Sequence, residues 1–140
     1  MDSRTDLADR IVDLLPRLQR LALALSGDPD LARSLTHDAV DRALDRLDGW
    51  RRDTRLDVWL FRQLIAWWTE TGSPSRPASA GEAAARLVAA LPDDQRLAAA
   101  LVLVDGCSYR EAADILAVTP GVVAGRLARA REALLQGLAQ

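Results

Sequence analysis

The sequence contains no lysine, one cysteine and one histidine. All 18 basic residues are arginine and the net charge is −2, so any contact with DNA must come from a local patch of charge. Cys107 has no second cysteine to form a disulfide, and no Cys/His spacing suits zinc. We therefore expect no metal and no other cofactor, and a reducing, cytoplasmic setting.

Residues suited to catalysis are also scarce. His37 falls on the predicted outer face of a helix among Asp and Arg residues, a position typical of a solvated side chain. No glycine-rich loop follows a strand, and the acidic residues are spread along helix surfaces. We expect no catalytic residue, no enzymatic activity and no small-molecule substrate.

Long apolar segments are absent as well. Residues 1–10 are charged and lack the apolar stretch of a signal peptide. The longest apolar run, residues 97–104, is too short to span a bilayer. We expect no association with a membrane.

Leu, Ala, Arg and Asp dominate the chain, which is 49% hydrophobic and 27% charged. This composition is typical of a globular protein built from helices, so we predict an all-α fold. Residues 72–81 are rich in Gly, Ser and Pro and show no periodicity, which predicts a linker between two helical modules, residues 1–71 and 82–140. Modules of roughly 60–70 residues have marginal cores, so packing against each other or onto a partner would stabilise both.

The first module begins with two amphipathic helices. Apolar residues recur at spacings of three and four over residues 7–25, and Pro16 should kink or split this helix. Asp28 and Pro29 mark the start of a second helix that ends near residue 48. Its expected buried residues are Leu31, Leu35, Val40, Ala43, Leu44 and Leu47.

Residues 108–131 have the pattern of a helix-turn-helix. Ser108 and Glu111 fit a capping box at the start of the first helix, and Thr119 and Pro120 fit the cap and first residue of the second. The second helix is expected to bury Val123, Leu127, Ala130 and Leu134, and to expose Arg126, Arg129 and Arg131. Two short helices with a buried seam and a basic outer face predict a DNA-binding unit.

Two segments together resemble the extracytoplasmic-function (ECF) sigma factors of bacteria. Residues 14–68 are similar to sigma region 2, with Leu-Pro-Arg-Leu, a Gly-Asp turn, an Asp followed by Arg-Ala-Leu, and Trp-Leu-Phe. Residues 91–134 are similar to region 4, with Leu-Pro-x-x-Gln-Arg, Ser-Tyr-x-Glu-Ala-Ala and Gly-x-Val-x-x-Arg-Leu-x-Arg-Ala-Arg. The resemblance implies a region 2-like three-helix module followed by a region 4-like helix-turn-helix module.

The resemblance also implies the partners: core RNA polymerase, promoter DNA and an anti-sigma factor. In that family region 2 binds the polymerase clamp through its second helix and opens the −10 element, and region 4 reads the −35 element. The implied polymerase-binding residues are Ser34, Leu35, His37, Asp38 and Arg42. The implied DNA-binding residues are Arg110, Pro120, Val122, Arg126, Arg129 and Arg131, with Trp67 and Trp68 as stacking aromatics.

The chain departs from the family pattern in its third helix, predicted over about residues 55–71. Arg55 and Arg62 there only balance Asp57 and Glu70, whereas the family has a run of basic residues. Holding single-stranded DNA normally uses a positive groove with stacking aromatics. In the reading helix, Val122 and Gly125 replace the usual Thr and Ser.

Three functions therefore stay open. The leading hypothesis is an ECF sigma factor that directs polymerase to promoters, which the arginines of the reading helix favour. The second is a degenerate, sigma-like decoy that sequesters an anti-sigma factor, which the neutral third helix favours. The third is a stand-alone helix-turn-helix transcription regulator that never contacts polymerase.

Overall fold

The computed structural model describes residues 3–51, 53–75 and 87–138, and all regular structure in these ranges is helical. The elements in chain order are α1 (Ser3–Ser26), α2 (Pro29–Asp45), the 3-10 helix η1 (Leu47–Gly49), α3 (Leu56–Glu70), α5 (Asp93–Ala99), the π-helix η2 (Ala100–Val104), α6 (Tyr109–Leu116) and α7 (Pro120–Leu138). The predicted all-α fold is confirmed. Residues 76–81 of the predicted linker lie outside the described ranges.

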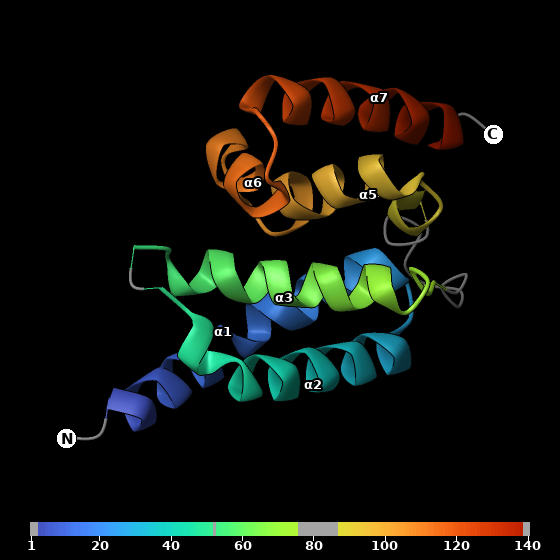
Figure 1. Ribbon diagram of the computed structural model, residues 1–140. Helices are drawn as coiled ribbons and strands as arrows, with labels where there is room; N and C mark the ends of the chain where they lie inside the picture. The colour runs from blue at the N-terminus through green and yellow to red at the C-terminus, as the bar shows by residue number, and fades with distance from the viewer. Residues whose placement is uncertain (1–2, 52, 76–86, 139–140) are drawn as a thin grey trace.

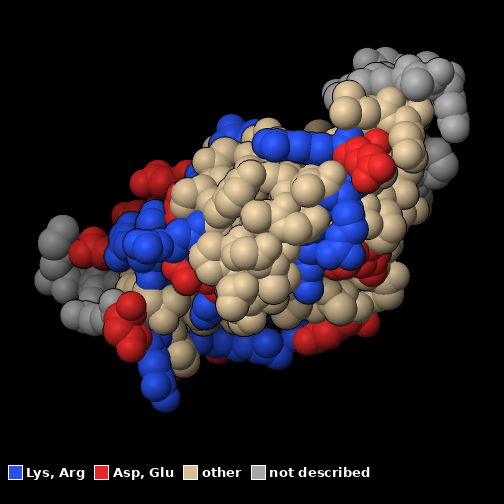
Figure 2. All heavy atoms as spheres, turned by 90° about the horizontal axis from the view of Figure 1, so that it is seen from above, with Lys and Arg blue, Asp and Glu red and all other residues tan. Residues whose placement is uncertain are grey.

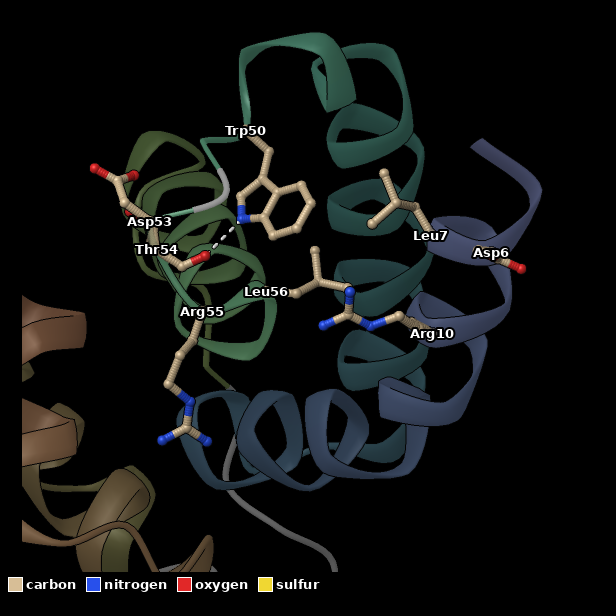
Figure 3. A pocket seen from close by; sticks show the side chains of 8 residues that line it. All are labelled: Asp6, Leu7, Arg10, Trp50, Asp53, Thr54, Arg55 and Leu56. Atoms are coloured by element: carbon tan, nitrogen blue, oxygen red, sulfur yellow. Dashed lines mark hydrogen bonds between the residues drawn. The ribbon is translucent and has the colours of Figure 1, made fainter. Parts of the chain in front are cut away.

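The amphipathic pattern of the first helix produces one continuous element. Pro16 is exposed inside α1 and does not split it, although the ribbon changes direction along its length (Figure 3). Ile11, Leu18 and Leu21 are each at most 1% exposed and face the core. None of the described helices is long and apolar enough to cross a membrane.

The start of α2 follows from its sequence, but its buried face differs from the predicted one. The Asp28 carboxylate accepts a hydrogen bond from the Leu31 N–H at 2.9 Å, and Pro29 is the first helical residue, as expected. Leu44 was expected to be buried and is 37% exposed. Small residues rather than the leucine pattern define the face that packs on α1 and α3, and it consists of Ala32, Leu35, Thr36, Ala39 and Ala43.

The helix-turn-helix forms as predicted. Ser108 and Glu111 complete the capping box of α6, and Ala117 adopts a left-handed conformation (φ 57°) that ends this helix. The Thr119 hydroxyl accepts a hydrogen bond from the Val122 N–H at 3.2 Å and so caps α7. The face of α7 that packs on α5 and α6 includes Val123, Leu127 and Ala130, all fully buried, whereas Leu134, which was also expected to be buried, is only partly buried.

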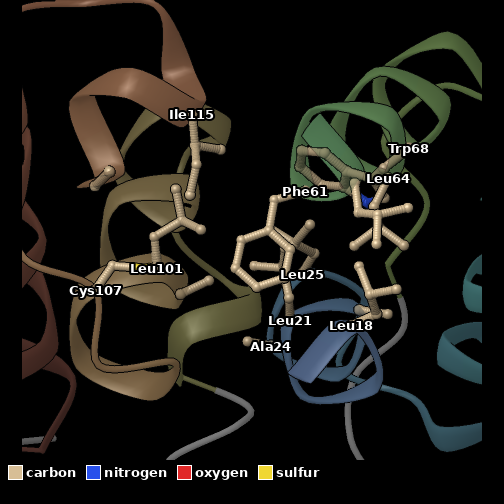
Figure 4. Close-up of a cluster of buried hydrophobic side chains, with 14 of the residues drawn as sticks. Leu18, Leu21, Ala24, Leu25, Phe61, Leu64, Trp68, Leu101, Cys107 and Ile115 are labelled. Carbon is tan, nitrogen blue, oxygen red and sulfur yellow. The ribbon is translucent and has the colours of Figure 1, made fainter. Parts of the chain in front are cut away.

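The N-terminal half (α1 to α3) and the C-terminal half (α5 to α7) pack directly on each other. Figure 1 shows the elements in layers, with α7 at one side of the molecule and α2 at the other. At the junction α3 contacts α6, and α1 contacts α5 and η2. Phe61 and Leu25 from the first half lie opposite Leu101 and Ile115 from the second in one buried cluster (Figure 4). The two halves therefore share a hydrophobic core in this arrangement.

Candidate nucleic-acid interface

The outer face of α7 carries two exposed arginines, Arg129 and Arg131. The Arg129 side chain lies back along the helix, with Nε donating to the Gly125 carbonyl at 3.4 Å. Arg126 is less free: its side chain is 26% exposed, and Nε lies 4.0 Å from Oδ2 of Asp94 on α5. Before these arginines, the first turn of α7 exposes the uncharged residues Pro120, Gly121 and Val122, the last of them 40% exposed. Figure 2 views the molecule from this side and shows an uncharged area bordered by basic and acidic side chains.

The other predicted DNA-facing residues of this half lie close to the helix starts. Pro120 is exposed at the first position of α7, and Arg110 is exposed in the first turn of α6. Because the dipole of a helix is positive at its N-terminal end, the start of α7 adds positive potential to that of the arginines. The structure thus exposes Arg110 and Pro120 in the first turns of their helices, and Arg129 and Arg131 farther along α7.

The predicted polymerase-facing residues divide into exposed and buried positions. Ser34, His37 and Asp38 are exposed along α2, whereas Leu35 is only 5% exposed and belongs to the core. Nδ1 of His37 lies 3.6 Å from carboxylate oxygens of both Asp38 and Asp41. This face therefore presents a polar strip with acidic character.

The neighbouring tryptophans of α3 point in different directions, as the sequence implies. Trp68 is fully buried, and its indole N–H donates to the Pro74 carbonyl at 3.1 Å, so this arrangement offers none of its ring to a base. Trp67 is half-buried, and the Arg42 guanidinium lies 4.2 Å from its ring centroid. Arg42 also donates to Glu70 at 3.1 Å, which fixes the guanidinium between α2 and α3.

The two arginines predicted for the third helix both contact the C-terminal half, although the shortest contact of Arg55 is a hydrogen bond of 2.8 Å to Asp57 in its own half. Nη1 of Arg55 lies 3.6 Å from Oε2 of Glu111, and Nε of Arg62 donates to the Asp114 carbonyl at 3.0 Å. Both acceptors are in α6. The region predicted to hold single-stranded DNA is therefore partly covered.

A groove that the sequence did not indicate lies between α1 and the loop before α3. It has a volume of about 520 Å³, and Figure 3 shows its lining side chains. The Trp50 indole N–H donates to the Thr54 carbonyl at 2.9 Å, which fixes the ring, and Arg10 lies 5.9 Å from the ring centroid. Leu7 and Leu56 supply apolar surface. A fixed aromatic ring beside an arginine suits the stacking of an unpaired base.

Two further arginines that the sequence did not single out connect the halves. Arg17 on α1 is 2.9 Å from Oδ2 of Asp105 and 3.3 Å from Oδ2 of Asp57. Arg96 on α5 is 7% exposed, and burial lowers the pKa of its guanidinium, an effect that nearby Asp93 opposes. Arg17 lies in the Leu-Pro-Arg-Leu motif and Arg96 in the Leu-Pro-x-x-Gln-Arg motif. Neither motif indicates which residue of the other half the arginine contacts.

Comparison with known proteins gives matches over most of the chain. Residues 81–134 match the family described as sigma-70, region 4. The chain is 30% identical to the ECF RNA polymerase sigma factor EcfG of Rhodopseudomonas palustris (strain TIE-1), in an alignment that covers 91% of this chain and 82% of that protein.

Two solved structures share the arrangement of helices. The sigma factor RpoE in complex with the anti-sigma factor NepR from Bartonella quintana matches with a TM-score of 0.80 and 26% identity, over 96% of this chain and 97% of that chain. CnrH in complex with the cytosolic domain of CnrY matches with a TM-score of 0.82, over 95% of this chain and 87% of that chain. At 23% identity the second match is a likeness of fold.

Proposed function

Because the chain belongs to the ECF family of RNA polymerase sigma factors, we propose that it directs core polymerase to promoters, with α7 reading the −35 element and α2 contacting the polymerase clamp. The observation that carries this proposal is the geometry of α7. Helix α7 lies on the side of the molecule away from the junction (Figure 1), its N-terminal end is capped by Thr119, and Arg129 and Arg131 are exposed on it. Arginine there can grip phosphates or bond guanine in the major groove.

The face of α2 supports the polymerase contact. Ser34, His37 and Asp38 form an exposed strip, and the buried Leu35 beneath them holds the helix in place without reaching a partner. Trp67 and Arg42 flank this strip on the side of α3. The strip has the polar, acidic character that would pair with a basic surface on the clamp.

We propose that single-stranded DNA of the −10 element binds in the groove beside Trp50. Arg10 lines it and can reach a phosphate, while the ring of Trp50 can stack on a base. Trp67 offers a second, partly covered ring, and Trp68 would serve only after rearrangement because it is fully buried.

An anti-sigma factor is the proposed regulator, since the sigma factor RpoE of Bartonella quintana was solved in complex with the anti-sigma factor NepR. The same likeness leaves a second function, a decoy that sequesters an anti-sigma factor. One observation favours it. Arg62 bonds to α6, and Arg55 pairs with Asp57 and Glu111, so both basic residues of 55–71 are already engaged.

Reconstituted transcription separates the two functions. The protein is mixed with purified core polymerase and a library of promoter fragments, and binding to core and specific transcript synthesis are measured together. If the chain is an initiator, it is expected to bind core polymerase and to yield transcripts. The double variant Ser34→Arg with Asp38→Arg should abolish core binding. Arg20→Glu, at an exposed position of α1, is the control and should leave core binding unchanged. Failure to bind core, with tight capture of an anti-sigma factor, would establish the decoy.

A further inference from the structure

The first two turns of α7 carry almost no side chain that could hydrogen-bond the edge of a base. In a helix-turn-helix these N-terminal turns are the part that meets the bases. Among residues 120–127, all of which the structure describes, Arg126 alone has a side-chain hydrogen-bonding group. That side chain is 26% exposed, and its Nε lies 4.0 Å from Oδ2 of Asp94, so an ion pair with α5 competes for it. Hydrogen bonds can therefore account for little of any base recognition by these turns.

Val122 is the large apolar side chain that these turns expose. It is 40% exposed in the first turn of α7, where the Thr119 hydroxyl fixes the backbone by accepting a hydrogen bond from the Val122 N–H at 3.2 Å. Gly121 and Gly125 on either side of it have no side chain, and a Cβ at either position would find its nearest neighbour at 3.9 Å. The isopropyl group of Val122 is therefore not covered, and the bare glycines allow the backbone to approach another surface closely.

The guanidinium of Arg129 lies next to this apolar surface. Its Nε donates to the Gly125 carbonyl at 3.4 Å, so the side chain turns back toward the start of the helix. Gly125 follows Val122 by three residues, and residues at this spacing are neighbours on a helix surface. Figure 2 shows basic side chains at the border of the uncharged area on this side of the molecule. An apolar contact surface with cations at its margin suits the major groove, where phosphates flank the base edges.

The 5-methyl group of thymine is the apolar group that the major groove offers to such a side chain. A C·G pair presents only hydrogen-bonding groups there, and covering these with an isopropyl group leaves them without a partner, which is costly. We propose that Val122 packs on the 5-methyl group of a thymine and makes α7 select a T·A pair at one position of its site. The inference rests on the proposed function, because it assumes that α7 enters the major groove of a duplex.

Removal of single methyl groups from the DNA tests this contact. The whole chain is first used to enrich a sequence from a library of duplexes that contain a randomised segment, and the enriched duplex becomes the probe. Each thymine of the probe is then replaced in turn by deoxyuridine, which lacks the 5-methyl group and keeps every hydrogen-bonding group of the base. Fluorescence anisotropy at one salt concentration measures the affinity of each duplex for the wild type and for the variants.

One thymine is expected to depend on its methyl group. At that position the deoxyuridine duplex should bind the wild type about fourfold more weakly, the factor expected for the burial of one methyl-sized group. Val122→Ala should bind the thymine and deoxyuridine duplexes equally, and it should stay folded because alanine is the best helix former. Leu135→Ala shortens another exposed apolar side chain of α7 and is the matched control, so it should keep the fourfold difference. In a C·G pair placed at that position, 5-methylcytosine should strengthen binding by the wild type and not by Val122→Ala.

The other results separate the inference from the proposed function. An enriched duplex in which no deoxyuridine weakens binding would overturn the thymine contact alone and leave the reading of a duplex by α7 in place. A methyl dependence of the same size in Val122→Ala, or its loss in Leu135→Ala, would overturn the assignment to Val122. Failure of the wild type to enrich any duplex would overturn the proposed reading of DNA by α7, and the inference with it.

Discussion

Arg17 and Asp105 lie 88 positions apart in the chain and form an ion pair with 2.9 Å between Nη2 and Oδ2. The Asp105 side chain is fully buried, while that of Arg17 is 30% exposed. Oδ1 of Asp105 is buried and has no hydrogen-bond partner among the described residues. The charge of Asp105 is therefore offset mainly by Arg17, with the Cys107 thiol 3.4 Å from Oδ2 as a weak donor.

This dependence predicts a loss of stability when the arginine is removed. Arg17→Met keeps most of the apolar side chain but leaves a buried carboxylate without its cation, so the free energy of unfolding should fall by about 2 kcal/mol. Urea denaturation measures the change, and Arg20→Met, at an exposed position of the same helix, is the control. The double variant Arg17→Met with Asp105→Asn should recover part of the loss. Equal midpoints for Arg17→Met and the control would contradict the assignment.

The neighbouring thiol predicts a pH dependence at the alkaline side. Burial, followed by the charge of Asp105, raises the pKa of Cys107 from 9.0 to about 12. The folded state therefore holds the thiol proton of Cys107 more tightly than the unfolded state does. The resulting stabilisation of the folded state is fully present below about pH 9 and is lost as the pH rises toward 12. Between those values the free energy of unfolding should fall by up to about 1.4 kcal/mol per pH unit more in the wild type than in Cys107→Ala.

Urea titrations at pH 8, 9.5 and 10.5 compare the two proteins. A thiol-reactive reagent gives an independent reading at pH 8, where the folded protein should react far more slowly than the protein in urea. Parallel stability curves across this range would show that the pKa of the thiol is not raised by folding.

The local parts of this structure could be predicted, and the contacts across the junction could not. The capping box at Ser108, the cap at Thr119 and the buried face of α7 depend on residues within one or two turns, so sequence spacing was sufficient. Arg96 and Leu25 are 71 positions apart, and no local pattern indicates that a charged residue will be buried against a distant carbonyl.

The same limit applied to the candidate site. Spacing predicted that Leu35 is buried, which the structure confirms, whereas its implied contact with polymerase came from the resemblance alone. Spacing could not tell which of the neighbouring residues Trp67 and Trp68 the other helices would cover, and Trp68 is the buried one. The groove beside Trp50 arises where a loop meets a helix from an earlier part of the chain, so it has no signature in either segment alone.

Phosphate contacts by α7 predict a salt-dependent loss of DNA binding. Arg129→Ala and Arg131→Ala should each weaken binding to a duplex −35 element and reduce the slope of log K against log salt by about 0.9. Both side chains are exposed, so neither change should alter the melting temperature appreciably. Fluorescence anisotropy at four salt concentrations measures the slope, with Arg20→Ala as the control. An unchanged slope in both variants would mean that this helix does not grip phosphate.

A glycine in the reading helix predicts a gain of both stability and affinity. A Cβ at Gly125 would meet only Nη2 of Arg129, at 3.9 Å, so a larger residue fits without displacing the backbone. Gly125→Ala should raise the free energy of unfolding by up to about 1 kcal/mol through helix propensity alone, and Gly125→Ser by about half as much. Of these two variants, only Gly125→Ser adds a hydroxyl to α7, at a position where the resemblance to ECF sigma factors implies a DNA contact. Gly125→Ser should therefore bind the duplex more tightly than Gly125→Ala, although it is the less stable of the two. Fluorescence anisotropy at one salt concentration measures both affinities. Equal affinities would show that position 125 does not face the DNA.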